Sequence, residues 1–338
     1  MNITEQLPAL NAYRQYLQPH YQRFPSGRYA NLLVVRKTLS ETIFRTEGSG
    51  EGLSKELVTA GMQASNRHAI RRVVISKRKQ TAVERRVGRE LLREHELLKT
   101  VMVNKTPQLC ALNTNAPCGK CIDCMLYGYA VGGGGAQKSR VMTDDAYSIG
   151  PVAQITSKRT FNATFDNGTM RNPLTNEAST SINEDEYVLP ETHFLDIETL
   201  KDVTLGELQY VIGNIARSSR YGAISSRLGR VRNTLAAIIF SDTEIFSNLE
   251  LTQSVYDTLK GERKELDFPL SDADLEQAVR DSTSALLARV VGREPIVVDG
   301  EPLQRILNET IALYRKPEDV KGFLQEIEQS YSSGMEAK

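Results

Sequence analysis

The chain has 338 residues, of which 40% are hydrophobic and 25% charged, and its 42 basic residues balance its 42 acidic ones. This composition indicates an ordinary folded protein with about two domains, or one domain with large insertions. No run approaches the ~18 consecutive apolar residues of a membrane span, and the first 17 residues lack a secretory pattern, so we expect a cytoplasmic protein.

A long strand is predicted over residues 29–46, where aliphatic and β-branched residues follow the turn sequence Pro25-Ser26-Gly27. The glycines of residues 48–52 end it, and a second, short strand is predicted at residues 71–76. Thr81 is expected to cap a helix that runs to about Leu98. Val83, Val87 and Leu91 lie on one side of that helix and its arginines on the others.

All four cysteines of the chain fall within fifteen positions, in the pattern C-x7-C-x2-C-x2-C: Cys110, Cys118, Cys121 and Cys124. Four thiolates fill the tetrahedral shell of a structural zinc ion, and two-residue gaps let the chain present successive sulfurs to one ion. An iron–sulfur cluster could use the same ligands, although the ferredoxin spacing is not matched. A disulfide or a redox pair also stays open. A zinc ion held by four protein ligands has no open position, so this site would hold a loop and not catalyse.

A flexible glycine loop and a hairpin are expected next. Gly132 to Gly135 form a glycine segment that ends in Lys138-Ser139-Arg140, but two residues separate the last glycine from the lysine, so a phosphate-binding Walker loop is rejected. Strand-like pieces at residues 152–156 and 160–165 precede the turn sequence Asp166-Asn167-Gly168. We expect a projecting hairpin here.

The remaining elements alternate and then become helical. We expect a strand at residues 194–200, a helix opened by Thr204, and a buried strand at the end of residues 222–240. After residue 248 nearly everything reads as helix, in segments at 249–259, 271–291 behind a Ser271 cap, 302–315 and 317–329. The sequence therefore predicts a mixed region followed by a helical tail.

Charge is distributed unevenly. Residues 67–93 hold ten basic and two acidic residues, residues 213–232 hold five arginines and no acid, and residues 242–283 hold eleven acids and four bases. Arginine-dense segments in a neutral chain are typical of phosphate-backbone binding. A solvated helix face with internal ion pairs remains the alternative. The acidic segment could pair with a basic face of a neighbouring copy.

Catalytic patterns are otherwise absent: the four histidines stand in unrelated contexts, without an H-E-x-x-H or Gly-x-Ser-x-Gly motif. Asp144, Asp145 and Asp196 are the carboxylates near basic segments that could hold Mg²⁺.

The sequence from Cys118-Gly119-Lys120-Cys121 through Cys124-Met125-Leu126-Tyr127-Gly128 to Lys138-Ser139-Arg140 resembles the signature of a known family. That family is the backbone subunit, in subtype D of the Cas-seven superfamily, of type I-D CRISPR surveillance complexes (Cascade). Thr160-Phe161-Asn162-Ala163, Gly168-Thr169-Met170-Arg171 and Tyr221-Gly222-Ala223 agree with it in the same order.

The resemblance implies an α+β fold with a modified ferredoxin-like (RRM-type) core that carries insertions. The implied parts are discontinuous core strands and helix at 26–46 and 190–241, a basic lid at 47–100, a zinc-binding insertion at 101–130, a return to the core at 131–150, a hairpin thumb at 151–189 and a helical domain at 242–338.

The resemblance also implies a non-catalytic subunit whose copies line up along CRISPR RNA, grip its phosphates and present its bases to target DNA, together with other subunits of the complex. Base pairing would then read sequence, and the protein would need only shape and backbone contacts. The implied RNA-binding residues are Arg45, Lys77, Arg78, Lys79, Lys138, Arg140, Lys158, Arg159, Thr160, Phe161, Asn162, Arg227, Gly229 and Arg230. Those that would face target DNA are Arg85, Arg86 and Arg89.

Two other functions remain open. A nuclease of the same superfamily would need a carboxylate at the displaced nucleotide, with Asp144, Asp145 or Asp196 as the suspects. A free-standing zinc-containing DNA-binding protein would bind a duplex sequence-specifically without RNA.

Overall fold

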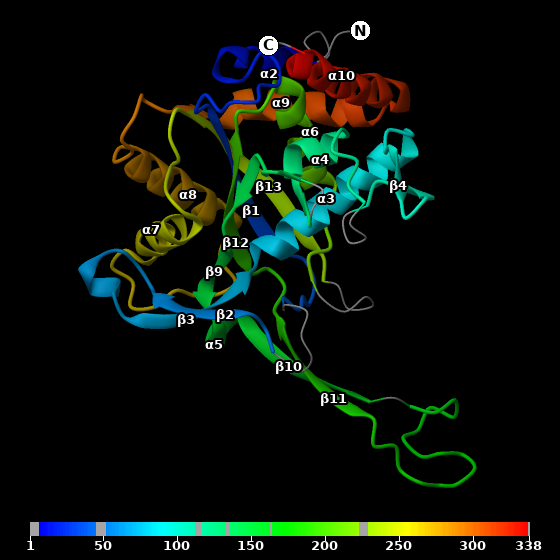
Figure 1. The fold of residues 1–338 in the computed structure, drawn as a ribbon. Helices are drawn as coiled ribbons and strands as arrows, with labels where there is room; N and C mark the ends of the chain where they lie inside the picture. Colours follow the sequence, from blue (N-terminus) through cyan, green and yellow to red (C-terminus); the bar gives the residue numbers. More distant parts are fainter. Residues whose placement is uncertain are drawn as a thin grey trace.

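A large antiparallel sheet organises the fold (Figure 1). The computed structural model describes residues 7–44, 52–111, 116–132, 135–162, 164–222 and 229–336. The strands of the sheet run in the order β14-β13-β1-β12-β9-β3-β2, and β8 also pairs with β12. They are β1 (Tyr29–Thr38), β2 (Lys55–Thr59), β3 (Ala69–Ile75), β8 (Val141–Thr143), β9 (Ala146–Pro151), β12 (His193–Lys201), β13 (Val231–Ser241) and β14 (Ile296–Val298). Helices cover this sheet, so the α+β class expected from the sequence is confirmed.

β1 lies in the middle of the sheet, and its side chains divide the interior into two cores. Leu32 and Val34 pack in one hydrophobic cluster, whereas Leu33 and Val35 pack in the other. Successive side chains of a strand point to opposite faces, so both faces of β1 are buried. This explains why β1 reads as a continuous apolar run.

Helices cover the two faces. Against the face of Leu32 and Val34 pack α3 (Lys77–Glu94), α4 (Ile122–Tyr127), α6 (Leu205–Arg217), α9 (Gly300–Tyr314) and α10 (Pro317–Glu336), with the short α2 (Pro8–Asn11). Against the other face pack α7 (Asn248–Lys260) and α8 (Asp272–Leu287). The helices after residue 241 are therefore divided between the two faces of one sheet. No helix within the described ranges is long and apolar enough to cross a membrane.

Several predicted helix starts are confirmed by their caps. The Thr204 side chain accepts from the Glu207 N–H, and Glu207 bonds back to the Thr204 N–H, which completes a capping box for α6. Ser271 likewise accepts from the Asp274 N–H at the start of α8. The first four N–H groups of a helix have no partner within it, which explains why Ser and Thr mark these ends in sequence.

Three smaller hairpins leave the sheet. β4 (Thr100–Val103) pairs with β5 (Thr106–Leu109), and β6 (Tyr129–Val131) with β7 (Gly135–Gln137). β10 (Thr156–Asn162) pairs with β11 (Ile182–Val188) and projects from the body of the molecule (Figure 1). The predicted turn at 166–168 forms, with Gly168 at φ +73°, but it lies in the long loop beyond the paired strands.

Several predicted boundaries are wrong for local reasons. β1 ends at Thr38, because the following chain leaves the sheet and Thr42 exchanges backbone hydrogen bonds of 3.2 and 2.8 Å with Val188. α3 starts after Ser76 and not at Thr81, whose hydroxyl instead lies 3.0 Å from that of Thr143. It ends at Glu94, before Glu96 takes a φ of 60°.

Two predicted segments have the wrong type. Residues 152–155, expected as a strand, form the short helix α5 (Val152–Ile155), which turns the chain from β9 into the hairpin and buries Ile155. Residues 296–298, expected within a helical tail, form β14, which pairs with Ile238 to Phe240 of β13. Tertiary packing overrides local propensity at α5, whereas the β-branched residues of β14 favour the strand that forms.

Candidate metal centre and nucleic-acid interface

The four cysteines converge at one point beside α4. Their sulfurs all lie within 4.8 Å of one another, and the distances Cys110–Cys121, Cys110–Cys124 and Cys118–Cys124 are 3.9, 3.5 and 3.9 Å. Sulfurs that bind one zinc ion tetrahedrally at about 2.3 Å stand about 3.8 Å apart. The donor set therefore fits a closed zinc site, as the spacing predicted.

Backbone N–H groups support the thiolate form of this cluster. The Cys118 N–H donates to Cys110 Sγ and the Cys121 N–H to Cys118 Sγ, each over 3.3 Å. Cys110, Cys121 and Cys124 are buried and Cys118 is partly exposed. With four cysteine ligands, a bound zinc ion would have no open coordination position for water or substrate. The ion would instead tie the β4–β5 hairpin to α4.

A buried ion-pair group joins this centre to α3. Asp123 is fully buried and accepts from Arg85 Nε at 2.7 Å and from Arg89 Nη1 at 2.6 Å. Arg89 also donates to the Cys110 carbonyl, and Arg85 donates to the Gly128 carbonyl at 2.6 Å. Both guanidinium groups therefore face the cysteine centre. Neither residue is proposed to contact target DNA, although both were expected to do so from the sequence. Arg86, on another side of α3, is exposed.

Arg140 also points into the molecule. Its guanidinium is largely buried, pairs with Glu207, donates to the Asp202 carbonyl at 3.0 Å and lies over the ring of Tyr21. This arginine joins the end of the glycine segment to the capping box of α6. Lys138, two residues earlier, is exposed and stays an RNA-contact candidate.

Lys77, Arg78 and Lys79 form the first turn of α3. Lys77 and Arg78 are exposed, Lys79 is half-buried, and that turn contains no acidic residue. The positive end of a helix dipole disfavours cations, so these three charges would be offset by a bound anion. One carboxylate is near, because Asp145 accepts from the Lys77 N–H at 2.8 Å.

The projecting hairpin is basic along β10 and acidic along β11. Lys158 lies 2.8 Å from Glu184, and Arg159 lies 2.5 Å from Glu41 and over the ring of Tyr187. Thr160 and Asn162 are exposed, and Phe161 is paired with Asn183 in the strand register. Lys158 and Arg159 are exposed in spite of their partners, so they can exchange a carboxylate for a phosphate.

Gly229 and Arg230 lie beside the end of β1. A Cβ on Gly229 would stand 1.9 Å from Thr42 Oγ1 and 2.4 Å from the Glu41 carbonyl, so only glycine fits this approach. The Arg230 side chain is exposed. Arg45 and Arg227 lie outside the described residues.

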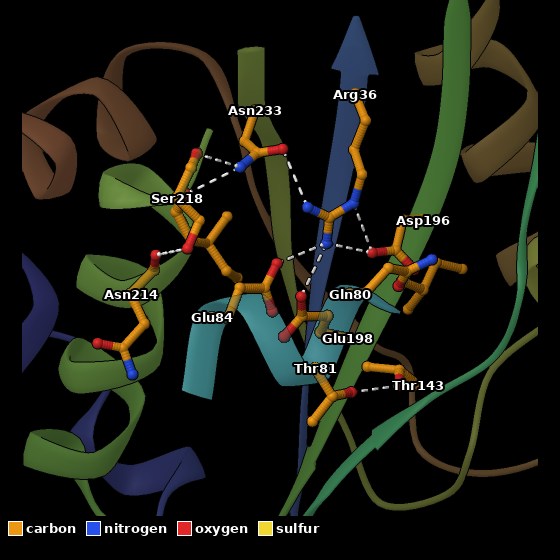
Figure 2. Close-up of polar contacts among 12 residues, drawn as sticks. Arg36, Gln80, Thr81, Glu84, Thr143, Asp196, Glu198, Asn214, Ser218 and Asn233 are labelled. Carbon is orange, nitrogen blue, oxygen red and sulfur yellow. Dashed lines mark hydrogen bonds and ion pairs between the residues drawn. The ribbon is translucent and has the colours of Figure 1, made fainter. Parts of the chain in front are cut away.

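The sequence reading missed a buried charge network at the centre of the sheet (Figure 2). Arg36 Nη2 lies 3.0 Å from Glu84, 2.5 Å from Asp196 and 2.9 Å from Glu198, and all four side chains are fully buried. Arg36 Nη1 donates to Asn233 at 2.9 Å. The signal was present: Asp196 and Glu198 are two residues apart in an apolar strand and so share one face.

The three carboxylates considered for a nuclease do not converge. Asp196 is held in the core by Arg36 and by Asn248 Nδ2 at 3.0 Å, and the same amide bonds the backbone carbonyls of Asp144 and Asp145 at 3.2 Å. Across the described ranges, the four cysteines are the only set of three or more potential metal ligands that come together.

Comparisons with known proteins identify the family. The family model described as Csc2 Crispr matches residues 16–324. The chain belongs to the Csc2 CRISPR family. This confirms the resemblance read from residues 118–140.

One solved structure shows the fold of this Csc2 family member. The crystal structure of Thermofilum pendens Csc2 matches with a TM-score of 0.63 at 18% sequence identity, covering 100% of this chain and 99% of that one. A chain described as "CRISPR RNA-guided surveillance complex" matches with a TM-score of 0.49 at 10% identity, covering 84% of this chain and 99% of that chain. A search of curated proteins gave no match.

Proposed function

We propose that this Csc2 family member is a non-catalytic subunit that binds CRISPR RNA, assembles with further copies of itself along it and presents the guide to target DNA in a type I-D surveillance complex. The observation that carries the proposal is the family match, which spans residues 16–324. The complex would act in antiviral defence and contain other subunits.

The order of the core elements supports an RRM-type core. Along the chain the core reads β1, α3, β9, β12, α6, β13, and in the sheet the strands are ordered β13-β1-β12-β9. This order matches the β-α-β-β-α-β pattern of a ferredoxin-like fold, and both helices pack on the same face, which supports the proposed core. Two of the proposed insertions fall between these elements: the zinc-binding insertion follows α3, and the thumb lies between β9 and β12. The proposed lid at 47–100 begins after β1 and includes α3.

The exposed cations support backbone binding. Lys77, Arg78, Lys138, Lys158 and Arg230 carry exposed side chains and come from four segments of the chain. Contacts of this kind grip phosphates without reading bases. In the proposal the β10–β11 thumb reaches over the RNA of the neighbouring copy, and Arg86 on α3 faces target DNA.

Zinc has a structural role in this proposal. Cys110, Cys118, Cys121 and Cys124 would hold the ion, which supplies a cross-link between the β4–β5 hairpin and α4. Asp123, Arg85 and Arg89 fix that unit on α3.

Extraction of the nucleic acid that co-purifies with the native complex tests the proposal. We expect uniform small RNAs that share a repeat-derived end. A bare monomer without affinity for RNA would contradict it.

A second experiment separates the binding subunit from the nuclease alternative. The assembled complex is incubated with complementary strands and Mg²⁺, and we expect no cleavage by this subunit. Regularly spaced cuts that are lost on Asp144→Ala or Asp145→Ala would replace the non-catalytic proposal.

A further inference from the structure

The outer edge of β13 is open over most of its length. β14 pairs with β13 only at Ile238, Ile239 and Phe240, and among the described strands none pairs with the outer edge at residues 231–237. The Val231 N–H points outward to the Ser219 carbonyl at 2.8 Å. Outward groups recur every second residue, so the N–H groups of Asn233 and Leu235 face the same side. Because the Val231 N–H is already bonded, the open edge runs from Asn233 to Ala237, about 17 Å, and is available to a further strand.

Two helices extend past this edge on opposite faces of the sheet. α8 packs on one face with Val279 and Leu287, and α9 packs on the other with Leu303. Between them, beside Thr234 to Ala237, lies a groove of about 840 Å³. Its apolar lining includes Leu235, Ala236, Val279, Leu287, Leu303 and Leu307. The groove therefore lies where a further strand of the sheet would lie, with α8 on one side of it and α9 on the other.

A buried hydroxyl also marks the groove. Thr283 of α8 is 5% exposed and lines the groove, and its Oγ1 has no hydrogen-bond partner among the described residues. Buried hydroxyls are normally paired, because leaving one unpaired costs free energy. A polar group entering the groove would satisfy it.

The charge of the rim selects the occupant. Glu276, Asp281, Glu294 and Asp299 line the groove against a single cation, Arg280. An acidic rim repels phosphates, so the groove does not suit RNA or DNA. It suits an extended polypeptide with apolar side chains at alternate positions and with lysine or arginine beside them.

We propose that this groove, the β13 slot, is a strand-accepting site for an extended basic segment of another protein subunit. The segment adds to the edge of β13, and its alternate side chains pack on α8 and α9. This goes beyond RNA binding, because it assigns a protein partner to a surface that carries none of the RNA-contact candidates.

A second copy of this chain fits the slot less well. In the described parts of the chain the basic run of residues 67–93 lies mostly in β3, which is paired on both sides, and in α3. Neither offers a free extended strand, and the basic strand β10 is held in its hairpin by the acidic β11, where Lys158 already pairs with Glu184 at 2.8 Å. The occupant is therefore assigned to a different chain.

The test selects peptides for the slot from a phage-displayed library of random 12-residue peptides, with the full-length protein as bait. Ser284→Trp serves as counter-selection, because Ser284 is exposed, lines the slot and lies on α8, so a large ring there fills the groove. Ala285→Trp is the matched control, since Ala285 is exposed on α8 outside the slot. Melting temperatures of both variants confirm folding.

We expect enriched peptides with alternate apolar and basic residues that bind the wild type and Ala285→Trp equally and Ser284→Trp at least tenfold more weakly. Glu276→Lys with Asp281→Lys should weaken them, whereas Glu262→Lys with Glu265→Lys, outside the slot, should not. The proposal would be overturned if no peptide were enriched on the wild type relative to Ser284→Trp. It would also be overturned if the enriched peptides were acidic. Loss of self-association or of RNA binding in Ser284→Trp would also overturn it, because the slot would then bind a second copy or RNA. RNA binding is measured on the same samples. If the protein fails to bind RNA, the peptide-binding result still tests the β13 slot independently.

Discussion

Cys121 is the best single residue with which to test the metal centre. It is fully buried, its sulfur lies 3.9 Å from Cys110 Sγ, and its backbone precedes α4. Cys121→Ser leaves three thiolates and a buried hydroxyl, so we expect loss of about one zinc per chain, faster proteolysis within residues 105–130 and a lower melting temperature. Metal analysis, limited proteolysis and thermal unfolding measure the three effects.

Lys120→Ala is the matched control for that change. Lys120 is exposed in the same loop and is not a ligand, so its metal content and melting temperature should equal those of the wild type. Iron in place of zinc, with the absorbance of a cluster, would favour the iron–sulfur alternative. Unchanged metal content in Cys121→Ser would show that the cysteines do not bind an ion together.

Glu198 makes stability depend on pH. Burial, and then the neighbouring Glu84, raise the pKa of Glu198 well above its usual range. One guanidinium faces three carboxylates, and three ionised carboxylates would leave excess negative charge in the core. Glu84 Oε2 and Glu198 Oε2 both lack a partner among the described residues, and a proton held by Glu198 would let one donate to the other.

The sign of the pH effect follows from that raised pKa. The stabilisation is fully present below the unfolded pKa of about 4.3 and is lost as pH rises through the folded pKa. Relative to Glu198→Gln, whose amide stays neutral, the wild type should lose up to about 1.4 kcal/mol per pH unit above pH 5. Urea unfolding of both proteins from pH 5 to 8 measures this difference. Glu90→Gln, exposed on α3, should run parallel to the wild type.

At the residue scale, sequence predicted best where spacing alone defines the chemistry. The four cysteines meet as predicted, because two-residue gaps suffice to bring sulfurs together. Arg89 and Arg140 were expected on nucleic acid, yet their guanidinium groups pair with Asp123 and Glu207. Their partners lie 34 and 67 residues away. Nothing in a local arginine run reveals such distant partners.

At the scale of elements, α3 combines a structural side and a surface side. Arg85 and Arg89 hold Asp123 of α4, whereas Arg86 is exposed. The residues that the basic run placed together thus have two different roles. Helical geometry separates them, because adjacent residues on a helix do not share a face.

Arg85→Ala and Arg86→Ala therefore make a matched pair. Arg85→Ala leaves Asp123 with one partner in a buried position, so we expect a loss of about 2–4 kcal/mol in the free energy of unfolding and weaker zinc retention. Arg86→Ala should leave both unchanged within about 0.5 kcal/mol and weaken only binding of target DNA to the RNA-loaded complex. Chemical denaturation and an electrophoretic binding assay separate the two. Equal destabilisation by both changes would contradict the assignment.

Elements with caps or strong periodicity were predicted from sequence, and those that depend on distant pairing were not. α6 and α8 start at Thr204 and Ser271 as expected. β14 has only three residues and exists because β13 offers an edge, and α5 forms where the chain must turn into the hairpin. Local propensity predicts neither the free edge of β13 nor the turn of the chain into the hairpin.

At the scale of the whole molecule, a neutral chain separates its charges over different surfaces. Basic side chains lie at the start of α3, on the projecting hairpin and beside the end of β1, whereas acidic side chains surround the β13 slot. A single net charge of zero hides this arrangement. It lets one subunit bind a phosphate backbone on some surfaces and a basic protein segment on another.

This separation predicts how RNA binding depends on salt. Each phosphate contact to a single strand contributes about −0.7 to the slope of log K against log salt concentration. Replacing Lys77, Arg78 and Lys79 by alanine should therefore make the slope less steep by about 2, and should weaken binding most at low salt. The control replaces Arg293, Arg305 and Lys316, which are exposed, are not RNA-contact candidates and give the same change in net charge. Its slope should match the wild type, because net charge alone releases no counterions from the RNA. Equal slopes for all three proteins would remove the start of α3 from the RNA-binding surface and leave the hairpin, Lys138 and Arg230 as its remaining cations.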